Sequence, residues 1–211
     1  MLRRIVCAVS LISSAYAATP IDGLYSVAFG GLAQLPNNIS NTIDTVYANQ
    51  GQFNSGFNAG GALGYKQDFW RYEAEVTYIK SDLSNIQINN VAYENPNALG
   101  YSQGLIGLLN AYLDLPYKPS TLLQPFIGAG LGYGWIQTNI NVQPYINTVL
   151  NNNSFAYQGT AGLGFNFSEN YGLSVAYRYI GTTHINTIGN TFQAHLITGS
   201  AVYRFDACEF K

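Results

Sequence analysis

The sequence predicts an all-β fold, an eight-stranded antiparallel up-and-down transmembrane β-barrel. Three observations predict it. Only 9% of the 211 residues are charged, against about 25% in soluble domains. Apolar residues alternate with small or polar ones in eight segments, and the connections between these segments are alternately short and long. Together they indicate strands whose bulky face meets lipid rather than water.

The first 17 residues have the pattern of a cleaved secretory signal peptide. Arg3 and Arg4 precede an apolar run over 5–12, and residues 15–17 read AYA. This A-x-A pattern predicts cleavage after Ala17, and the apolar run is far shorter than the roughly 20 residues of a membrane-spanning helix. We therefore expect a signal peptide at 1–17, a barrel at 18–205 and a short periplasmic tail at 206–211.

Charge and cysteine content narrow the function classes. The chain has 9 basic and 11 acidic residues, and this mild acidity gives no reason to expect a nucleic-acid partner. Cys7 would leave with the signal peptide, so Cys208 has no partner within the chain. We expect Cys208 to be an inert tail thiol, with an intermolecular bridge as the alternative.

Eight segments follow the period-two pattern of a strand, in which successive side chains point to opposite faces. They cover approximately 23–33, 56–66, 69–80, 101–115, 126–136, 155–167, 171–181 and 191–205. The fifth, FIGAGLGYGWI, is the clearest, because glycine occupies every second position between Phe126 and Ile136. Most of these segments are near the 9 to 11 residues with which a tilted strand crosses a bilayer.

The lengths of the connections predict at which end of the barrel the two termini lie. Short connections lie at 67–68, around 116–120 and at 168–170, and long Asn-rich ones lie at 34–55, 81–100, 137–154 and 182–190. In an up-and-down barrel, all short turns and both termini then lie at one end. In membrane barrels of this type that end is periplasmic, so the long loops are expected to be extracellular.

The two faces of the expected strands differ in kind. A soluble lipid-carrying barrel would show charge to water, whereas here the polar face carries mainly Gly, Ala, Ser, Thr and Asn. Aromatic residues cluster near both strand ends, as expected for two interfacial girdles. One girdle is Tyr65, Trp70, Tyr72, Phe167, Tyr203 and Phe205, and the other is Tyr78, Trp135, Phe155, Tyr157 and Tyr179.

Five segments carry a resemblance to a known family. They are RYEAEVTY (71–78), NAYLDLP (110–116), PFIGAGLGYG (125–134), YQGTAGLGFNFSENYGLSVAYRYI (157–180) and VYRF (202–205). In their order and spacing they resemble the opacity-protein and surface-antigen family of outer-membrane barrels, and the membrane domain of outer-membrane protein A is similar.

The resemblance implies an eight-stranded barrel in a Gram-negative outer membrane, with surface loops that often act as antigens or in adhesion to a host-cell or matrix ligand. We therefore expect an adhesin, a surface antigen or an envelope-stabilising protein. The resemblance also implies periplasmic chaperones and a barrel-assembly machinery that reads a terminal aromatic strand, a role that fits Tyr203 and Phe205. The chain departs from the family by continuing past Phe205 as DACEFK.

The stretch WRYEAEVTYIK, residues 70–80, concentrates charge in an apolar strand. Alternation places Trp70, Tyr72, Ala74, Val76 and Tyr78 on the lipid face and Arg71, Glu73 and Glu75 in the bore. Eight strands enclose a space that side chains fill, so buried charges there must pair. We expect Glu75, and as a further candidate Glu73, to pair with Arg178 on the strand across the bore.

The remaining bore charges are expected at the short-turn end, where Lys66, Asp114 and Arg204 complete the network. On the first strand, Ser26, Ala28, Gly30 and Leu32 are expected to face inward. Opposite the glycines of 126–136, these small side chains would leave a small polar cavity, and a small-solute channel is therefore one alternative function.

A lipid-A-modifying enzyme is a less favoured alternative. Catalysis needs a nucleophile with a positioned base, and the two histidines, His184 and His195, show no His-x-Ser pattern. We therefore expect no catalytic residue, no cofactor and no metal site. Lys80 lies on the lipid face at the far end of its strand, where it could meet lipopolysaccharide phosphates or simply be solvated.

Overall fold

The computed structural model describes residues 21–36, 41–43, 46–88, 91–94, 98–115, 123–142, 146–185 and 190–205. The strands are β1 (Gly23–Gln34), β2 (Asn41–Ile43), β3 (Val46–Phe53), β4 (Gly56–Gln67), β5 (Trp70–Ile88), β6 (Val91–Glu94), β7 (Ala98–Asp114), β8 (Leu123–Val142), β9 (Ile146–Asn166), β10 (Tyr171–Ile185) and β11 (Asn190–Arg204). Within these residues no helix is long and apolar enough to span a membrane. The expected signal peptide and tail, with Cys208, lie outside the described residues.

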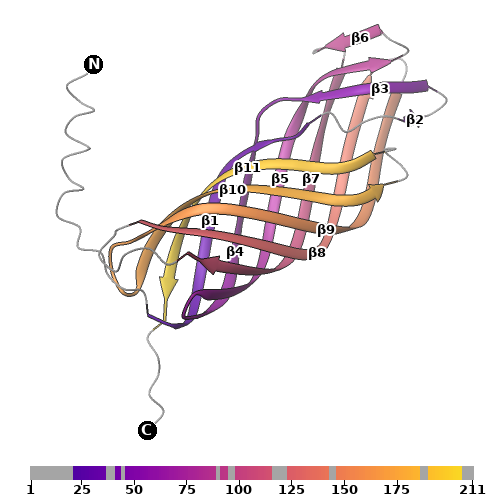
Figure 1. Cartoon of the computed structure of the whole chain (residues 1–211). Coiled ribbons are helices and arrows are strands. Elements are labelled where there is room, and N and C mark those ends of the chain that lie inside the picture. The colour runs from indigo at the N-terminus through magenta and orange to yellow at the C-terminus, as the bar shows by residue number, and fades with distance from the viewer. Residues whose placement is uncertain are drawn as a thin grey trace, which may run out of the picture.

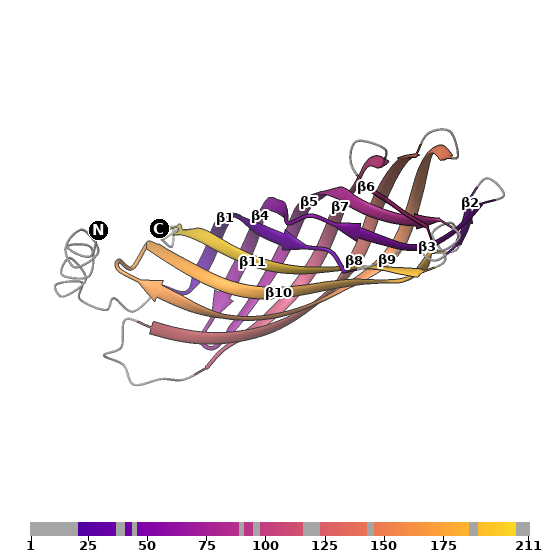
Figure 2. The ribbon, with the colours of Figure 1, turned by 90° about the horizontal axis from the view of Figure 1, so that it is seen from above.

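Eight of the strands close into a ring, which confirms the predicted fold class (Figure 1). Around the ring the order is β1, β4, β5, β7, β8, β9, β10 and β11, and β11 pairs antiparallel with β1. Apart from this closing pair, each pairing in the ring joins two ring strands that follow one another along the chain. The result is a tilted tube without a free edge along its main body (Figure 2).

We call the two ends of the tube the turn end and the loop end. Gly23, Gln67, Asn166 and Arg204 lie at the turn end, where β1 and β11 meet through the Tyr25 and Arg204 pair. β4 turns into β5 through Asp68 and Phe69, and Asp68 has a positive φ of 54°, which Asp tolerates better than most residues. The expected turn around 116–120 lies outside the described residues.

The expected long loops are largely built as strand. β5 runs on to Ile88, β8 to Val142, and β9 begins at Ile146. Three short strands add to this extension: β3 and β6 pair with the far part of β5, and β2 pairs with β3. The four predicted loop ranges are therefore wrong in part, because strand pairing continues well past the expected strand ends.

The outer face is apolar, as alternation predicted. Leu63, Tyr72, Val76, Leu109 and Leu131 are all about half exposed or more. Among the girdle residues, all six at the turn end and Trp135, Phe155 and Tyr157 at the loop end point outward with exposed rings, while Tyr78 and Tyr179 on the same face are half-buried. A tube clad in such side chains is suited to lipid.

The predicted inward face of the first strand is wrong. Tyr25 is buried and Leu24 and Leu32 are exposed, so the bore receives Tyr25, Val27 and Phe29. The physical reason lies on β4: a Cβ at Gly64 or Gly60 would collide with the ring of Tyr25 or Phe29. The glycines of β4 thus make room inside the bore for two large rings.

The glycine stripe of β8 faces the bore, and groups of the neighbouring strand lie against it. Tyr112 of β7 lies over Gly128, and Asn110 lies over Gly130. A Cβ at Gly130 would stand 1.8 Å from the Asn110 Oδ1. The space left by the glycines is filled by the neighbouring strand.

The loop-end half of the bore holds a cluster of buried apolar side chains, which we call the apolar plug, together with buried hydroxyl side chains such as Ser102 and Thr138. The members of the plug are Ala33, Leu35, Phe53, Ile79, Leu83, Ile86, Ile106, Leu108, Ile136, Ile140, Val142, Ala156, Ile180, Phe192, Ala194 and Leu196. Ile79, Ile106 and Ile140 are fully buried. Burial of this set gives the extended strands a hydrophobic reason to remain in register.

Candidate functional site

The centre of the bore holds a closed ring of hydrogen bonds, which we call the central ring. Arg178 of β10 donates from Nη2 to Glu75 Oε1 of β5, its ion-pair partner, and to Gln158 Oε1 of β9 at 2.7 Å. The amide of Gln158 donates to Asn110 Oδ1 at 3.1 Å. Asn110 of β7 completes the cycle by donating to Glu75 Oε2 at 2.7 Å.

Two further side chains support the central ring. Thr77 donates to Glu75 Oε1 and accepts from Arg178 at 3.2 Å. The Arg178 guanidinium stands 4.6 Å from the Phe29 ring centroid, a cation–π contact. The ring therefore joins four strands, and Phe29 brings in β1 as a fifth. Glu75 and Arg178, which were expected to pair, do so here.

A cavity of about 40 Å³ adjoins the central ring on the side of Tyr112 and Phe126. Within the described part of the chain, the buried Thr160 Oγ1 and Arg178 Nε have no protein partner, and both residues line this cavity. A space of that size has room for two or three water molecules. It is too small to form a conducting path by itself.

Arg71 holds a second cluster toward the turn end. Its Nε donates to Asp114 Oδ1 at 2.8 Å and its Nη1 to Glu73 Oε1 at 3.3 Å. Tyr25 donates its hydroxyl to the same Glu73 oxygen at 2.7 Å. Glu73, one candidate partner of Arg178, is instead paired with Arg71, because both side chains point into the bore from the same strand two residues apart.

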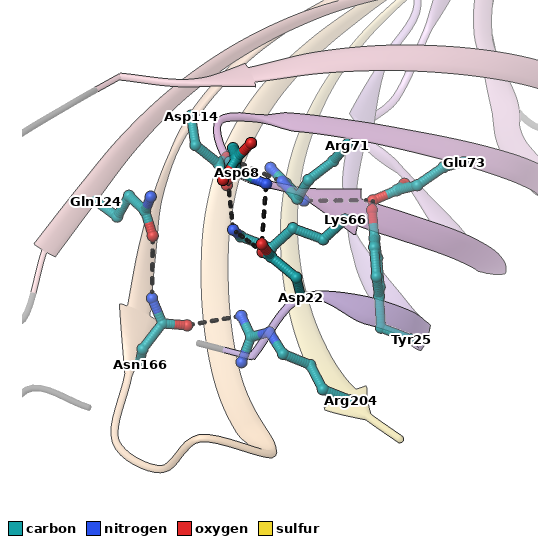
Figure 3. Close-up of polar contacts among 10 residues, drawn as sticks. All are labelled: Asp22, Tyr25, Lys66, Asp68, Arg71, Glu73, Asp114, Gln124, Asn166 and Arg204. Carbon is teal, nitrogen blue, oxygen red and sulfur yellow. Dashed lines mark hydrogen bonds and ion pairs between the residues drawn. The ribbon is translucent and has the colours of Figure 1, made fainter. Parts of the chain in front are cut away.

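Lys66 closes the turn end with a partner that the sequence did not suggest. Its Nζ stands 2.8 Å from Asp22 Oδ1 and also donates to the Asp68 carbonyl, while the Asp68 N–H donates to Asp22 (Figure 3). Partial burial alone would raise the pKa of Asp22. The two hydrogen bonds and the charge of Lys66 outweigh it and lower the pKa below its ordinary value.

Arg204 lies beside these clusters but contacts no carboxylate among the described residues. Its Nη2 donates to Asn166 Oδ1 at 2.7 Å, and Asn166 donates to Gln124 Oε1 at 3.2 Å. Figure 3 shows this chain of three side chains apart from the Lys66 cluster. The seven predicted bore residues thus all point inward, but they form separate groups rather than one continuous network.

A polar band crosses the outer face at the loop end. Tyr78 donates to Gln103 at 2.8 Å, Gln103 to Gln137 at 2.7 Å, and Gln137 to Asn151 at 2.9 Å. Lys80 stands beside the band, with its Nζ 5.1 Å from the Tyr101 ring centroid. These residues share the lipid-facing parity, so the band marks a level where the outer face becomes polar.

The same outer face carries Tyr203, Phe205 and His195. Tyr203 and Phe205 pack edge to face at 5.1 Å, and the Phe205 N–H donates to the Leu24 carbonyl. The Tyr177 hydroxyl stands 2.6 Å from His195 Nδ1. The side chain of His184 lies outside the described residues. Among the described residues, no three His, Cys, Asp or Glu side chains gather as metal ligands would.

The sequence model of the family described as "Outer membrane protein beta-barrel domain" matches residues 5–205. The chain belongs to this family. Its members are outer-membrane β-barrels, so the protein is a β-barrel of the Gram-negative outer membrane, as the sequence resemblance implied.

Individual relatives of the family are distant. An "Outer membrane protein" of Gluconacetobacter diazotrophicus is 28% identical over 149 residues, which cover 64% of this chain and 37% of that protein. The chain thus spans little more than a third of that curated relative's length.

Solved structures of similar fold include two outer-membrane barrels. Neisserial surface protein A has a TM-score of 0.58 at 16% identity, with 87% of this chain and 97% of that one covered. OprG from Pseudomonas aeruginosa has a TM-score of 0.54 at 12% identity, with 88% and 98% covered. At such identities the likeness shows the fold.

Proposed function

We propose that this protein is a closed, non-catalytic outer-membrane barrel that presents its loop end at the cell surface, as an adhesin or surface antigen or as a protein that stabilises the envelope. The observation that carries this proposal is the filling of the bore. The central ring joins strands across it, and the apolar plug occupies the half beyond. The two cavities described in the bore are each about 40 Å³, far below the roughly 300 to 1,000 Å³ of a ligand pocket.

The form of the loop end supports a contact role. β3 and β6 extend the wall through pairing with β5, and buried Phe53 and Ile86 anchor the extension to the plug. A surface that is held in place loses little conformational entropy when a partner binds it. The loops that connect these strands then stand on a rigid base.

Replacement of residues 36–45 or of residues 89–97 by a Gly-Ser segment of the same length tests this role, because both ranges leave the plug residues of the first two predicted loops in place. We expect the loss of host-cell or matrix binding by expressing cells, while the barrel remains folded, as checked by its gel mobility before and after heating. If neither replacement changes binding, the adhesin role is wrong and a purely structural role remains.

The orientation of the chain is part of the proposal. A single cysteine placed at Ser55, near the loop end, should react with a membrane-impermeant reagent on intact cells, in a background where Cys208 is serine. A cysteine at Phe69 in the turn between β4 and β5 should react only after the outer membrane is broken. The reverse pattern would contradict the orientation.

Lys80 and the polar band support contact with lipopolysaccharide. An ammonium beside amide and phenol groups suits a phosphate or sugar at the membrane boundary. Added lipopolysaccharide should raise the unfolding temperature of the purified barrel, and Lys80→Gln should reduce the increase. Lys66→Gln removes the same charge at the turn end and serves as the control. An equal response of all three proteins would remove Lys80 from this role.

Two other functions are checked directly. Single-channel recording tests whether the protein is a channel. Mass spectrometry of lipid A, from cells that express the protein and from cells that lack its gene, tests whether it is a lipid-modifying enzyme. We expect neither discrete conductance steps nor a change in lipid A mass. The chaperones and the barrel-assembly machinery remain proposed partners, with Tyr203 and Phe205 as the proposed signal.

A further inference from the structure

The extended wall at the loop end has an outward face that is rich in amide side chains. β8 and β9 continue as a pair beyond Thr182, the last residue of β10 that pairs with β9 (Figure 1). On this wall seven amide residues share the outward parity, and we call them the amide grid. They are Gln103 of β7, Gln137, Asn139 and Asn141 of β8, and Asn147, Asn151 and Asn153 of β9.

The strand register places these amides side by side. Gln103 lies opposite Gln137, and Gln137 lies opposite Asn151. Two residues further toward the loop end on each of two strands, Asn141 lies opposite Asn147. The side chains of the grid therefore form neighbouring rows on one sheet surface.

The composition of this face is unusual for a strand surface in water. Asn is depleted from β-strands, yet it recurs at alternate positions of β8 and β9. Charged residues make up about 25% of soluble domains, whereas β7, β8 and β9 together contain one charged residue, Asp114, whose partner is Arg71 in the bore. The grid is thus polar without charge, and it offers hydrogen bonds but no ammonium or guanidinium for a phosphate.

The hydrogen bonds inside the grid leave capacity for a ligand. Gln103 donates to Gln137 at 2.7 Å and Gln137 to Asn151 at 2.9 Å, and each bond uses one of the two N–H groups of an amide nitrogen. The row ends at Asn151, whose own amide nitrogen has no acceptor among the described residues. Asn147 and Asn153 are exposed. Sugar hydroxyls both donate and accept, so they match amides that present a donor and an acceptor together.

Two aromatic side chains border the grid. Trp135 lies on the membrane side of it and is 39% exposed. Tyr101 is half-buried between Lys80 and the grid, and its hydroxyl donates to Gln137 at 3.3 Å. A ring that is polar at one edge offers its apolar face to the C–H groups of a sugar. Neutral amides beside such rings are suited to a saccharide.

The place of the grid on the barrel indicates which saccharide it meets. The grid continues the lipid-facing side of the wall beyond Trp135 and lies next to Lys80. Outside the hydrocarbon of a Gram-negative outer membrane, this side of a barrel meets the lipid A phosphates and then the sugars that they carry. A host glycan would approach from the tips of the loops instead.

We propose that the amide grid binds uncharged sugars of the lipopolysaccharide oligosaccharide. The inference rests on the proposed outward orientation of the loop end, and it extends the proposed Lys80 contact from phosphate to sugar.

Two forms of lipopolysaccharide from isogenic strains test the grid. One carries the complete oligosaccharide, and the deep-rough form keeps the lipid A phosphates but lacks the outer sugars. The chain has two tryptophans, so Trp70→Phe leaves Trp135 beside the grid as the fluorescent reporter. Titration of the full chain in mixed detergent micelles should show tighter binding of the complete form. Equal affinities for the two forms would overturn the proposal.

A double variant, Asn139→Val with Asn151→Val, tests the residues in the same Trp70→Phe background. Valine is favoured in strands, so the barrel should fold. The affinity for the complete form should fall about 2- to 10-fold for each hydrogen bond lost, while the affinity for the deep-rough form stays the same. Gln67→Val, which removes an exposed amide at the turn end, is the matched control and should change neither affinity. An unchanged double variant, or an equal loss in the control, would contradict the assignment.

Lys80→Gln separates the sugar contact from the phosphate contact. It should weaken the binding of both forms by the same factor and leave the difference between them. Micelles impose no orientation on the barrel, so a failure here is distinct from a failure of the cysteine labelling or of the loop replacements. Amide ladders can also join two copies of a chain. Dimers of the wild type without lipopolysaccharide, lost in the double variant, would overturn the proposal in favour of self-association.

Discussion

Arg178 links opposite walls of the bore, and its replacement should therefore destabilise the whole barrel. In Arg178→Ala, Glu75 would remain buried without its cation, a situation that typically costs about 3 to 5 kcal/mol. Urea unfolding of the barrel in detergent or bicelles measures this loss. Unchanged stability would show that the ion pair has no structural role.

The double variant Arg178→Ala with Glu75→Gln provides the control for this prediction. It removes both charges, so no uncompensated carboxylate remains, and its loss should be smaller than the sum of the two single losses. Additive losses would mean that Arg178 and Glu75 act independently, in contradiction to their contact.

Gly130 should be intolerant of even one added methyl group. Its Cβ would stand 1.8 Å from Asn110 Oδ1, so Gly130→Ala must displace a member of the central ring. We expect a loss of about 1 to 3 kcal/mol in urea unfolding, the usual cost of overpacking. Gly159→Ala is the matched control, because its Cβ would meet nothing within 4 Å. Similar losses in both variants would point to a backbone effect.

Among the strands, β8 shows how much of a strand could be predicted from the sequence. The alternation of its glycines predicted the strand, and Ile136, Ile140 and Val142 continue the same inward parity into the plug. The flanking Asn residues concealed this continuation, since Asn-rich runs are typical of turns. A search that extended the parity beyond the first Asn would have added Ile140 and Val142 to the expected bore residues.

β1 shows where alternation fails. Both of its faces carry apolar residues, so hydrophobicity alone does not decide which one meets lipid. The deciding facts are non-local: Gly60 and Gly64 on β4 admit Phe29 and Tyr25, and Glu73 needs the Tyr25 hydroxyl. For the same reason the partners Asp22, Asn110 and Gln158 could not be assigned before the strand register was known.

The extended part of β8 should behave as core rather than as loop. Ile140 is fully buried in the plug, so Ile140→Ala should cost about 2 to 5 kcal/mol. Val149 on the adjacent β9 is 47% exposed, and Val149→Ala should change stability by less than about 0.5 kcal/mol. Urea unfolding measures both. A negligible loss for Ile140→Ala would mean that the extension is not packed.

The last strand, β11, should matter for assembly more than for stability. Phe205 is exposed on the outer face and contacts Tyr203, so Phe205→Ala removes little buried area. We expect less folded barrel in the outer-membrane fraction of cells but unchanged refolding into detergent. Phe167→Ala, at an equally exposed turn-end aromatic, is the control and should assemble normally. Equal defects in both would argue for a general interfacial effect.

For the molecule as a whole, the proposed closed barrel has two kinds of side-chain filling along its bore. The central ring is polar and could in principle rearrange, whereas the plug is a packed set of aliphatic and aromatic side chains. A polar ring alone would make ion passage depend on one ion pair. The apolar plug, with fully buried Ile79, Ile106 and Ile180, would still block ions in the proposed closed barrel when that pair is broken, because an ion cannot be desolvated there without a large cost.

This arrangement predicts how conductance responds to mutation. In planar bilayers the wild type should show no discrete steps, and Arg178→Ala should also remain silent although it is less stable. A large porin in the same bilayers provides the positive control. Steps in Arg178→Ala but not in the wild type would show that the ion pair, rather than the plug, closes the bore. Steps in the wild type would contradict the closed barrel itself, and with it the proposed function.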